Sequence, residues 1–295
     1  MNIAVIGAGK WGQALHFAIS KTTPCKITSR QPKPIADFVS LEDALKCEYL
    51  IFALPAQVVR NWLKEHFVFS NQKVLVAAKG IEQGSGKFLN EIFAEFIPEE
   101  NLCFLSGPSF ASEVMKGLPT AVVINAYNHT LAKTFASFFP PFIKTYTSSD
   151  VIGAEVCGAY KNVLAIASGI CDGLNLGNNA RASLIARGLV EMHRFGKFFG
   201  AQEETFLGLS GAGDLFLTAS STLSRNYRVG LFLAEGKTLP SILEALGEVA
   251  EGVFTSEAIF ELSSKHAIYT PIAHEIALIL KGKAPKQSVK DLLAD

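Results

Sequence analysis

Short apolar runs alternate with amphipathic segments through the first half of the chain. The segments between the runs carry apolar residues at helical spacing, for example at 57–66 and 87–96. Strands that are apolar at nearly every position are typical of a parallel sheet with helices on both faces. We therefore expect an α/β fold with a Rossmann-like doubly wound sheet. Its strands would be the runs 2–6, 25–30, 49–54, 74–78, 102–105, 121–125 and 142–146.

After residue 172 the strand pattern mostly stops and helical periodicity takes over. This change predicts a mostly α-helical C-terminal domain, with no internal repeat and no low-complexity linker. We expect a dinucleotide-binding domain at 1–148 and a helical substrate-binding and catalytic domain at 149–295. The predicted helices are 179–199, 213–223, 241–246, 256–265 and 271–281.

The stretch 149–172 predicts a long helix that is buried on all sides. Ser149 is its expected N-cap, and apolar or small residues cover nearly every face. Only Glu155 and Lys161 are notable ionisable groups between Val151 and Cys171. A buried ammonium is costly unless partners hold it, so Lys161, which Asn162 follows, is the candidate catalytic residue. The alternative is that Lys161 extends its charged end to a nearby surface.

The first apolar run leads directly into a glycine-rich turn. Gly7, Gly9 and Gly12 have the Gly-x-Gly-x-x-Gly spacing between a predicted strand and a predicted helix. In a dinucleotide site the first glycine makes the tight turn, the second lets the pyrophosphate approach, and the third lets helix and strand pack closely. The helix N-terminus supplies N–H groups for the phosphates. This turn therefore predicts a dinucleotide cofactor.

The end of the second strand bears on which dinucleotide is bound. NAD enzymes usually have an acidic residue here for the ribose 2′-hydroxyl, whereas this chain has Ser29 and Arg30. A guanidinium and a hydroxyl suit a 2′-phosphate, which favours NADP, with NAD as the alternative. The competing interpretation is that Arg30 is a solvated loop residue before Pro32.

Further polar residues stand at strand or helix ends. Lys79 and the Gly107–Ser109 turn follow predicted strands, where ligands gather in such sheets. Asp214 begins a glycine-flanked helix, either as a site carboxylate or as a charge on the helix dipole. Ser224, Arg225 and Asn226 offer several donors for a phosphate, or form a polar helix end. Glu251 has no obvious structural need.

Composition narrows the class of protein. The chain has 295 residues, 49% hydrophobic and 18% charged, so it can bury two cores. Its net charge of zero gives no footprint for nucleic acid, and no run predicts a membrane span or signal peptide. Five scattered cysteines without a Cys-x-x-Cys pair argue against a structural zinc and favour a cytoplasmic protein. No histidine spacing indicates a metal site.

Several of these motifs together resemble one family, the bacterial NAD(P)-dependent glycerol-3-phosphate dehydrogenases. The resemblance covers almost the whole chain and includes Lys79-Gly80 and Lys161-Asn162-Val163. The other matching stretches are 7–12, 106–111, 211–215, 224–226 and 249–252. It implies reversible reduction of dihydroxyacetone phosphate to sn-glycerol 3-phosphate for phospholipid synthesis. A homodimer is a further expectation from the family.

The resemblance also assigns roles to residues. It implies that Lys161 donates and accepts the proton. Substrate contacts would come from Lys79, Gly107, Ser109, Lys161, Asp214, Ser224, Arg225 and Asn226. Cofactor contacts would come from Trp11, Arg30, Lys79, Ala111, Arg225, Val249 and Glu251, together with the glycines of the turn. The chain departs from the family at Lys10, often Ser, and at Tyr160, often Leu.

The proposed chemistry requires a lowered pKa at Lys161. Burial and the second cation Lys79 lower it, while Asp214 raises it, and we expect burial and Lys79 to dominate. Two rivals remain. A β-hydroxyacid dehydrogenase would turn over a phosphate-free hydroxy acid, and a non-catalytic NADP-sensing protein would bind cofactor without oxidising it.

Overall fold

The computed structural model describes residues 2–247 and 250–294. Contacts divide the chain into two compact units, the first made of residues 1–78 and 89–154 and the second of residues 79–88 and 155–295. The ten residues 79–88 therefore belong to the second unit, although they stand between two strands of the first. The domain boundary expected between 148 and 149 stays a prediction, and these units are described separately below.

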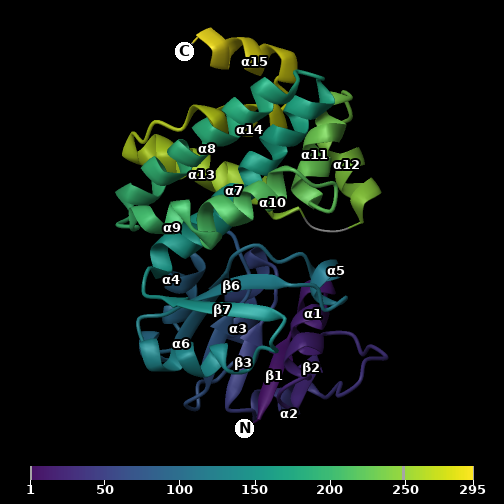
Figure 1. The fold of residues 1–295 in the computed structure, drawn as a ribbon, viewed down its shortest axis with the longest axis vertical. Coiled ribbons are helices and arrows are strands. Elements are labelled where there is room, and N and C mark those ends of the chain that lie inside the picture. The colour runs from purple at the N-terminus through teal and green to yellow at the C-terminus, as the bar shows by residue number, and fades with distance from the viewer. Residues whose placement is uncertain (1, 248–249, 295) are drawn as a thin grey trace. The chain divides into compact units, whose positions relative to one another are not determined.

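The first unit is built on one seven-stranded sheet (Figure 1) with the order β2-β1-β3-β4-β5-β6-β7. Strands β1 to β5 pair in parallel, which confirms the predicted α/β class. The strand order reverses at β1 and β3, where doubly wound folds bind their ligands. The strands are β1 (Ile3–Ile6), β2 (Cys25–Thr28), β3 (Tyr49–Phe52), β4 (Lys73–Val76), β5 (Leu102–Ser106), β6 (Thr120–Asn125) and β7 (Ile143–Ser148).

One pairing differs from an all-parallel sheet. β6 runs antiparallel to β5, and β7 is parallel to β6. An apolar run looks the same in either direction, so the sequence pattern did not indicate this reversal.

Alternate strand residues face two separate cores. In β1, Ile3 and Val5 join one apolar cluster, while Ala4 and Ile6 join the other. The first cluster includes buried residues of α1 (Lys10–Ile19), α5 (Ala111–Val114) and α6 (His129–Ala136). The second includes residues of α2 (Leu41–Leu45), α3 (Val59–His66) and α4 (Leu89–Ala94). Both faces of the sheet are therefore covered by helices, as near-continuous apolar strands require.

The second unit is helical and centres on α7 (Val151–Gly173), whose first four residues belong to the first unit. Other helices surround α7 (Figure 1), and most of its side chains are buried. The other helices are α8 (Asn178–Phe198), α9 (Glu203–Leu207), α10 (Asp214–Ala219), α11 (Arg225–Ala234), α12 (Leu239–Leu246), α13 (Glu251–His266), α14 (Pro271–Leu280) and α15 (Pro285–Ala294). The π-helical turn η3 (Leu209–Gly213) leads into α10. The sequence pattern did not single out α9, α11 or α15.

The N-cap of α7 corrects one detail of the sequence analysis. Asp150 Oδ1 accepts a hydrogen bond from Gly153 N at 2.9 Å, three residues on, as an N-cap does. The prediction of Ser149 as the cap is therefore wrong by one residue.

Glycines let α7 and α11 approach closely. A Cβ on Gly169 of α7 would lie 2.0 Å from Tyr227 O, and one on Gly230 of α11 would lie 2.1 Å from Ile166 O. These distances leave no room for a side chain at the crossing. The contact brings α11 and its first residues against the helix that carries Lys161.

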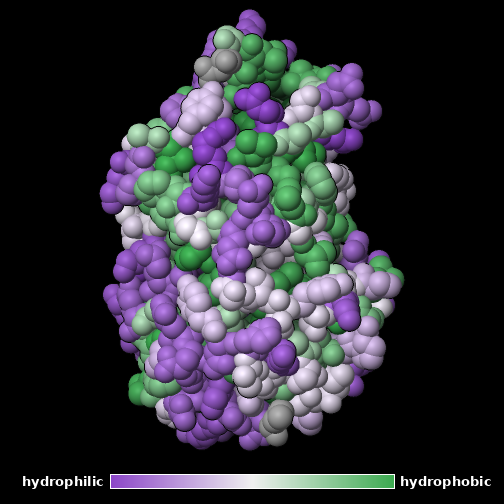
Figure 2. Space-filling view, turned by 60° about the vertical axis from the view of Figure 1, so that its left-hand side comes forward, coloured by the Kyte–Doolittle hydropathy of each residue, from purple (hydrophilic) through white to green (hydrophobic). Residues whose placement is uncertain are grey.

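On the face drawn in Figure 2, polar and apolar side chains are interspersed. Among the described residues, no helix is long and apolar enough to cross a membrane. The longest helix, α7, is interrupted by ionisable residues such as Glu155 and Lys161.

Candidate active site

Two lysines and one aspartate form a buried charge cluster within the second unit. Lys161 Nζ lies 2.5 Å from Asp214 Oδ1, and Lys79 Nζ lies 2.7 Å from Asp214 Oδ2. The side chain of Asp214 is 1% exposed, that of Lys161 10% and that of Lys79 19%. One carboxylate therefore holds both ammonium groups, which meets the need of a buried lysine for a partner.

Local geometry explains how these three residues meet. Asp214 is the first residue of α10, and Thr218 follows one turn later on the same helix face. Lys161 Nζ donates to Thr218 Oγ1 at 3.0 Å as well as to Asp214. Gly158, one turn before Lys161, leaves space for the Lys79 stem, whose Cγ would lie 3.2 Å from a Cβ there. Sequence reasoning missed Thr218, although its i+4 spacing from Asp214 was a usable signal.

The cluster changes the charge behaviour of its members. Burial lowers the pKa of Lys161 to about 8, with Asp214 opposing this shift and Lys79 adding to it. Burial alone would raise the pKa of Asp214, but the two ammonium groups outweigh it and hold that pKa below its ordinary value. Lys161 can thus exchange a proton near neutral pH while Asp214 stays ionised.

Amides connect the three helices beside this cluster. Asn226 Nδ2 donates to Asn162 Oδ1 at 2.9 Å, and Asn226 Oδ1 accepts from Gly252 N at 3.0 Å. Asn162 Nδ2 donates to Gly158 O at 3.2 Å. The amides thereby fix α11 and the start of α13 against α7. An amide nitrogen has two N–H groups, and among the described residues one of those of Asn226 is bonded, to Asn162.

The three residues predicted to bind a phosphate, Ser224, Arg225 and Asn226, have different positions at the start of α11. Ser224 is the N-cap of α11, and its Oγ accepts from Tyr227 N at 3.2 Å. Arg225, the first helical residue, is exposed. Ser224 and Asn226 thus both help to fix the helix. Their proposed ligand contacts would be additional to these roles.

The glycine turn has the geometry that a dinucleotide site needs. Gly7 has φ +108°, and a Cβ there would lie 2.6 Å from Ala53 O at the end of β3. A Cβ on Gly12 would lie 1.8 Å from Gly7 O, whereas Gly9 has nothing within 4 Å. The space beside Gly9 suits the approach of a pyrophosphate. Trp11 Nε1 donates to Ala77 O at 3.0 Å, which ties α1 to the residues after β4.

The other predicted site residues lie on both units. In the first unit, Gly107 has φ +101° after β5, Ser109 Oγ donates to Gly107 O at 3.1 Å, and Ala111 begins α5. Arg30 is exposed two residues after β2. In the second unit, Glu251 begins α13. Val249 lies outside the described residues.

Tyr160, the departure beside Lys161, is fully buried and hydrogen-bonded. Its hydroxyl donates to Glu191 Oε1 at 2.8 Å. Glu191 also accepts from Ile272 N and Ala273 N at the start of α14. Burial raises the pKa of Glu191 despite these donors. Tyr160 thus links α7, α8 and α14, a role that a leucine could not fill.

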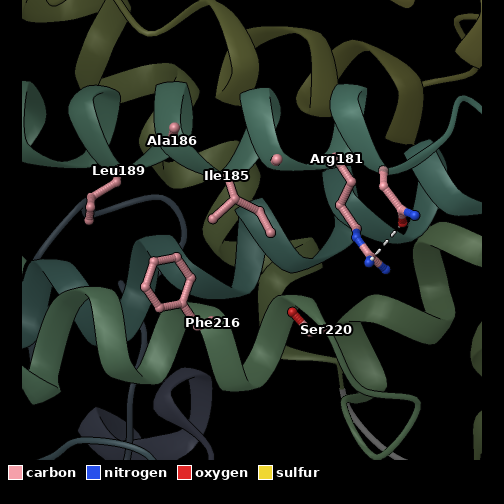
Figure 3. Close-up of a pocket in the computed structure, with 8 residues that line it drawn as sticks. Arg181, Ile185, Ala186, Leu189, Phe216 and Ser220 are labelled. Carbon is pink, nitrogen blue, oxygen red and sulfur yellow. Dashed lines mark hydrogen bonds between the residues drawn. The ribbon is translucent and has the colours of Figure 1, made fainter.

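A groove lies on the opposite face of α10 from the charge cluster. Phe216 and Ser220 line it together with α8 residues such as Arg181 and Ile185 (Figure 3), and its volume is about 600 Å³. Asp214 and Thr218 face Lys161, whereas Phe216 and Ser220 face this groove. The groove is therefore distinct from the charge cluster. Among residues 2–247 and 250–294, no group of His, Cys, Asp or Glu could hold a metal ion.

Comparison with known proteins identifies relatives along the whole chain. Residues 28–132 match the model of the NAD-dependent glycerol-3-phosphate dehydrogenase N-terminus, and residues 150–291 match that of its C-terminus. A glycerol-3-phosphate dehydrogenase (NAD(P)+) of Campylobacter jejuni is 64% identical over 293 residues, 99% of each chain. One from Sulfurimonas denitrificans is 61% identical over 100% of this chain and 99% of that one.

A solved structure agrees with these matches. The crystal structure of glycerol-3-phosphate dehydrogenase from Coxiella burnetii has a TM-score of 0.92 and 32% sequence identity. The match covers 100% of this chain and 99% of that one.

Proposed function

Because the chain belongs to the NAD-dependent glycerol-3-phosphate dehydrogenase family, we propose that it reversibly reduces dihydroxyacetone phosphate to sn-glycerol 3-phosphate. The single observation that carries the mechanism is the buried Lys161, held by Asp214 with a pKa of about 8. A lysine with that pKa can act as proton donor in one direction and as acceptor in the other.

When bound, the nicotinamide cofactor supplies or takes the hydride at C2 of the substrate. Lys161 delivers a proton to the C2 oxygen during reduction and removes it during oxidation. Asp214 and Thr218 fix the Lys161 ammonium, because both accept hydrogen bonds from it. Lys79 adds a second positive charge that stabilises negative charge developing on that oxygen.

The remaining polar residues would hold the substrate. We assign its phosphate to Arg225, with Ser224 and Asn226 beside it and Gly107 and Ser109 as further contacts. An exposed guanidinium at the first turn of α11 can form paired hydrogen bonds to phosphate oxygens, and the helix N-terminus favours the same charge. The chain's zero net charge makes such local cations necessary for an anionic substrate.

The cofactor would bind at the glycine turn of the first unit. The open space at Gly9 and the close contacts at Gly7 and Gly12 fit a dinucleotide. Trp11, Arg30, Ala111, Lys79, Arg225, Val249 and Glu251 are the proposed contacts around it. Arg30 supports NADP as the preferred cofactor and NAD as the weaker one, since no acidic residue follows β2 at this point.

The physiological setting follows from the reaction. We propose a cytoplasmic homodimer whose product, sn-glycerol 3-phosphate, supplies phospholipid synthesis. The family resemblance supports the dimer. Depletion of the protein should then create a growth requirement that added glycerol 3-phosphate relieves.

The direct test is the loss of NADPH absorbance after dihydroxyacetone phosphate is added. Lys161→Met should reduce turnover by roughly 10²–10⁴-fold or more, because the proton donor is lost, and should leave NADPH binding within a few-fold. Lys265→Met, at an exposed position of α13, is the matched control and should retain full turnover.

Two outcomes would contradict the proposal. Undiminished turnover by Lys161→Met would remove this residue from proton transfer. Turnover of phosphate-free hydroxy acids in place of dihydroxyacetone phosphate would indicate a β-hydroxyacid dehydrogenase.

A further inference from the structure

A lysine outside the sequence motifs contacts the glycine turn. Lys33 lies in the loop between β2 and α2, and its Nζ donates to Ala8 O at 2.6 Å. Ala8 is the residue between Gly7 and Gly9. Gln13 Nε2 donates to the same carbonyl at 3.0 Å. A surface loop thus delivers an ammonium group to the turn at which the dinucleotide is expected.

The loop that carries Lys33 is fastened to the first unit. Ile35, two residues on, packs against the apolar cluster that includes α1. Val39 N donates to Ile27 O at 3.0 Å, and Ile27 N donates to Asp37 O at 3.1 Å, so the loop returns alongside β2. The anchors at Ile35, Asp37 and Val39 therefore hold the backbone that follows Lys33 against the first unit.

The charge of Lys33 is poorly matched in this arrangement. Within the described part of the chain, its ammonium forms no ion pair with a carboxylate, and its recorded acceptor is the neutral carbonyl of Ala8. Arg30 in the same loop is exposed. Two cations thus stand in one loop, and a phosphate group is a stronger acceptor for an ammonium than a peptide carbonyl is.

Building on the proposed NADP-dependent function, we infer that Lys33 is a specificity-determining residue that binds the 2′-phosphate of NADP together with Arg30. In dinucleotide folds the adenosine ribose lies near the glycine turn and the end of the second strand. Lys33 connects these two elements directly. Arg30 alone would give one cation for a group that carries close to two negative charges, and Lys33 supplies the second.

The test measures binding of a cofactor fragment, independently of turnover. Calorimetric titration with adenosine 2′,5′-bisphosphate and with 5′-AMP isolates the 2′-phosphate. Lys33→Gln should weaken binding of the bisphosphate by about ten- to a hundredfold, as expected for a lost charged hydrogen bond, and change 5′-AMP binding little. Lys33→Arg should restore most of the affinity. In turnover, Lys33→Gln should lower kcat/KM for NADPH and spare that for NADH.

Lys21→Gln is the matched control, because this cation lies over the Phe17 ring at the other end of α1. It should leave both affinities unchanged. Unchanged binding of the bisphosphate by Lys33→Gln, or equal weakening of both fragments, would overturn the inference. The proposed reaction is tested separately, on the unmodified protein. If that protein does not oxidise NADPH when dihydroxyacetone phosphate is added, the proposed function is wrong, whatever the Lys33 variants show.

Discussion

Opposing influences set the pKa of Lys161. Burial favours its neutral form, Asp214 favours its charged form, and Lys79 opposes the charge. One oxygen of Asp214 contacts Lys161 and the other contacts Lys79, so the two ammonium groups share one carboxylate. The result is a pKa of about 8 for Lys161, close to working pH, in a residue that is normally charged throughout that range.

The direction of this shift predicts opposite pH profiles for the two reactions. Reduction needs the protonated amine, so its kcat/KM should fall as pH rises through about 8. Oxidation needs the neutral amine, so its kcat/KM should rise through the same range. Steady-state rates between pH 6 and 10 in both directions are the measurement, and parallel profiles would contradict the assignment.

Lys161 should also affect stability with a definite sign. Its pKa is lower in the folded chain than the ordinary 10.5, so between about 8 and 10.5 the unfolded chain binds more protons. The free energy of unfolding should therefore gain from Lys161 as pH rises through this window. Lys161→Met should lack that contribution, which denaturant unfolding at several pH values would reveal.

At this scale the local pattern singled out Lys161, whereas the expectation that Lys79 and Asp214 act on it followed from the family resemblance. Lys161 stood out because almost no other charge interrupts the 149–172 stretch. Asp214 lies 53 residues further along, and Lys79 lies 135 residues before Asp214, so no local pattern reports their contact. Lys33 was missed for the same reason, since its partner Ala8 is 25 residues away.

Among the elements, the crossing of α7 and α11 leads to a sharp prediction. Gly230→Ala would place a Cβ about 2 Å from a carbonyl oxygen of α7, and backbone cannot rotate out of the way. We expect the helices to separate and the free energy of unfolding to fall by about 1–3 kcal/mol or more. KM for dihydroxyacetone phosphate should also rise, because Arg225 begins α11.

Chemical denaturation and steady-state kinetics check this expectation. Ser183→Ala, at an exposed position of α8, should alter neither quantity. Unchanged stability of Gly230→Ala would mean that the two helices pack less tightly than described.

The sequence predicted the helices and strands that have a clear apolar run or a clear helical spacing of apolar residues. Each of the seven predicted runs overlaps a strand, with ends that differ by up to two residues, and 271–281 corresponds closely to α14. The direction of β6 could not be read, because an apolar run has no polarity. The short helix α9 and the Arg-Asn-Tyr-Arg start of α11 lack a clear apolar stripe, and tertiary packing decides their conformation.

For the whole molecule, the proposed oligomeric state is open to a simple measurement. Light scattering coupled to size exclusion should give about twice the single-chain mass of 31.8 kDa. Because a dimer dissociates on dilution, the measurement should cover a range of protein concentrations. A mass of one chain at every concentration would contradict the homodimer.

Residues 79–88 limit how this protein can be divided. A gene fragment cut at residue 149 would encode every helix of the second unit but would omit Lys79 and its neighbours. Phe88, whose ring centroid lies 5.2 Å from that of Phe199, would be lost as well. If the two halves were supplied as separate polypeptides, Lys79 would come from the N-terminal half, while Lys161 and Asp214 would come from the C-terminal half. Swapping C-terminal halves between relatives would likewise exchange Lys161 and Asp214 without their companion Lys79.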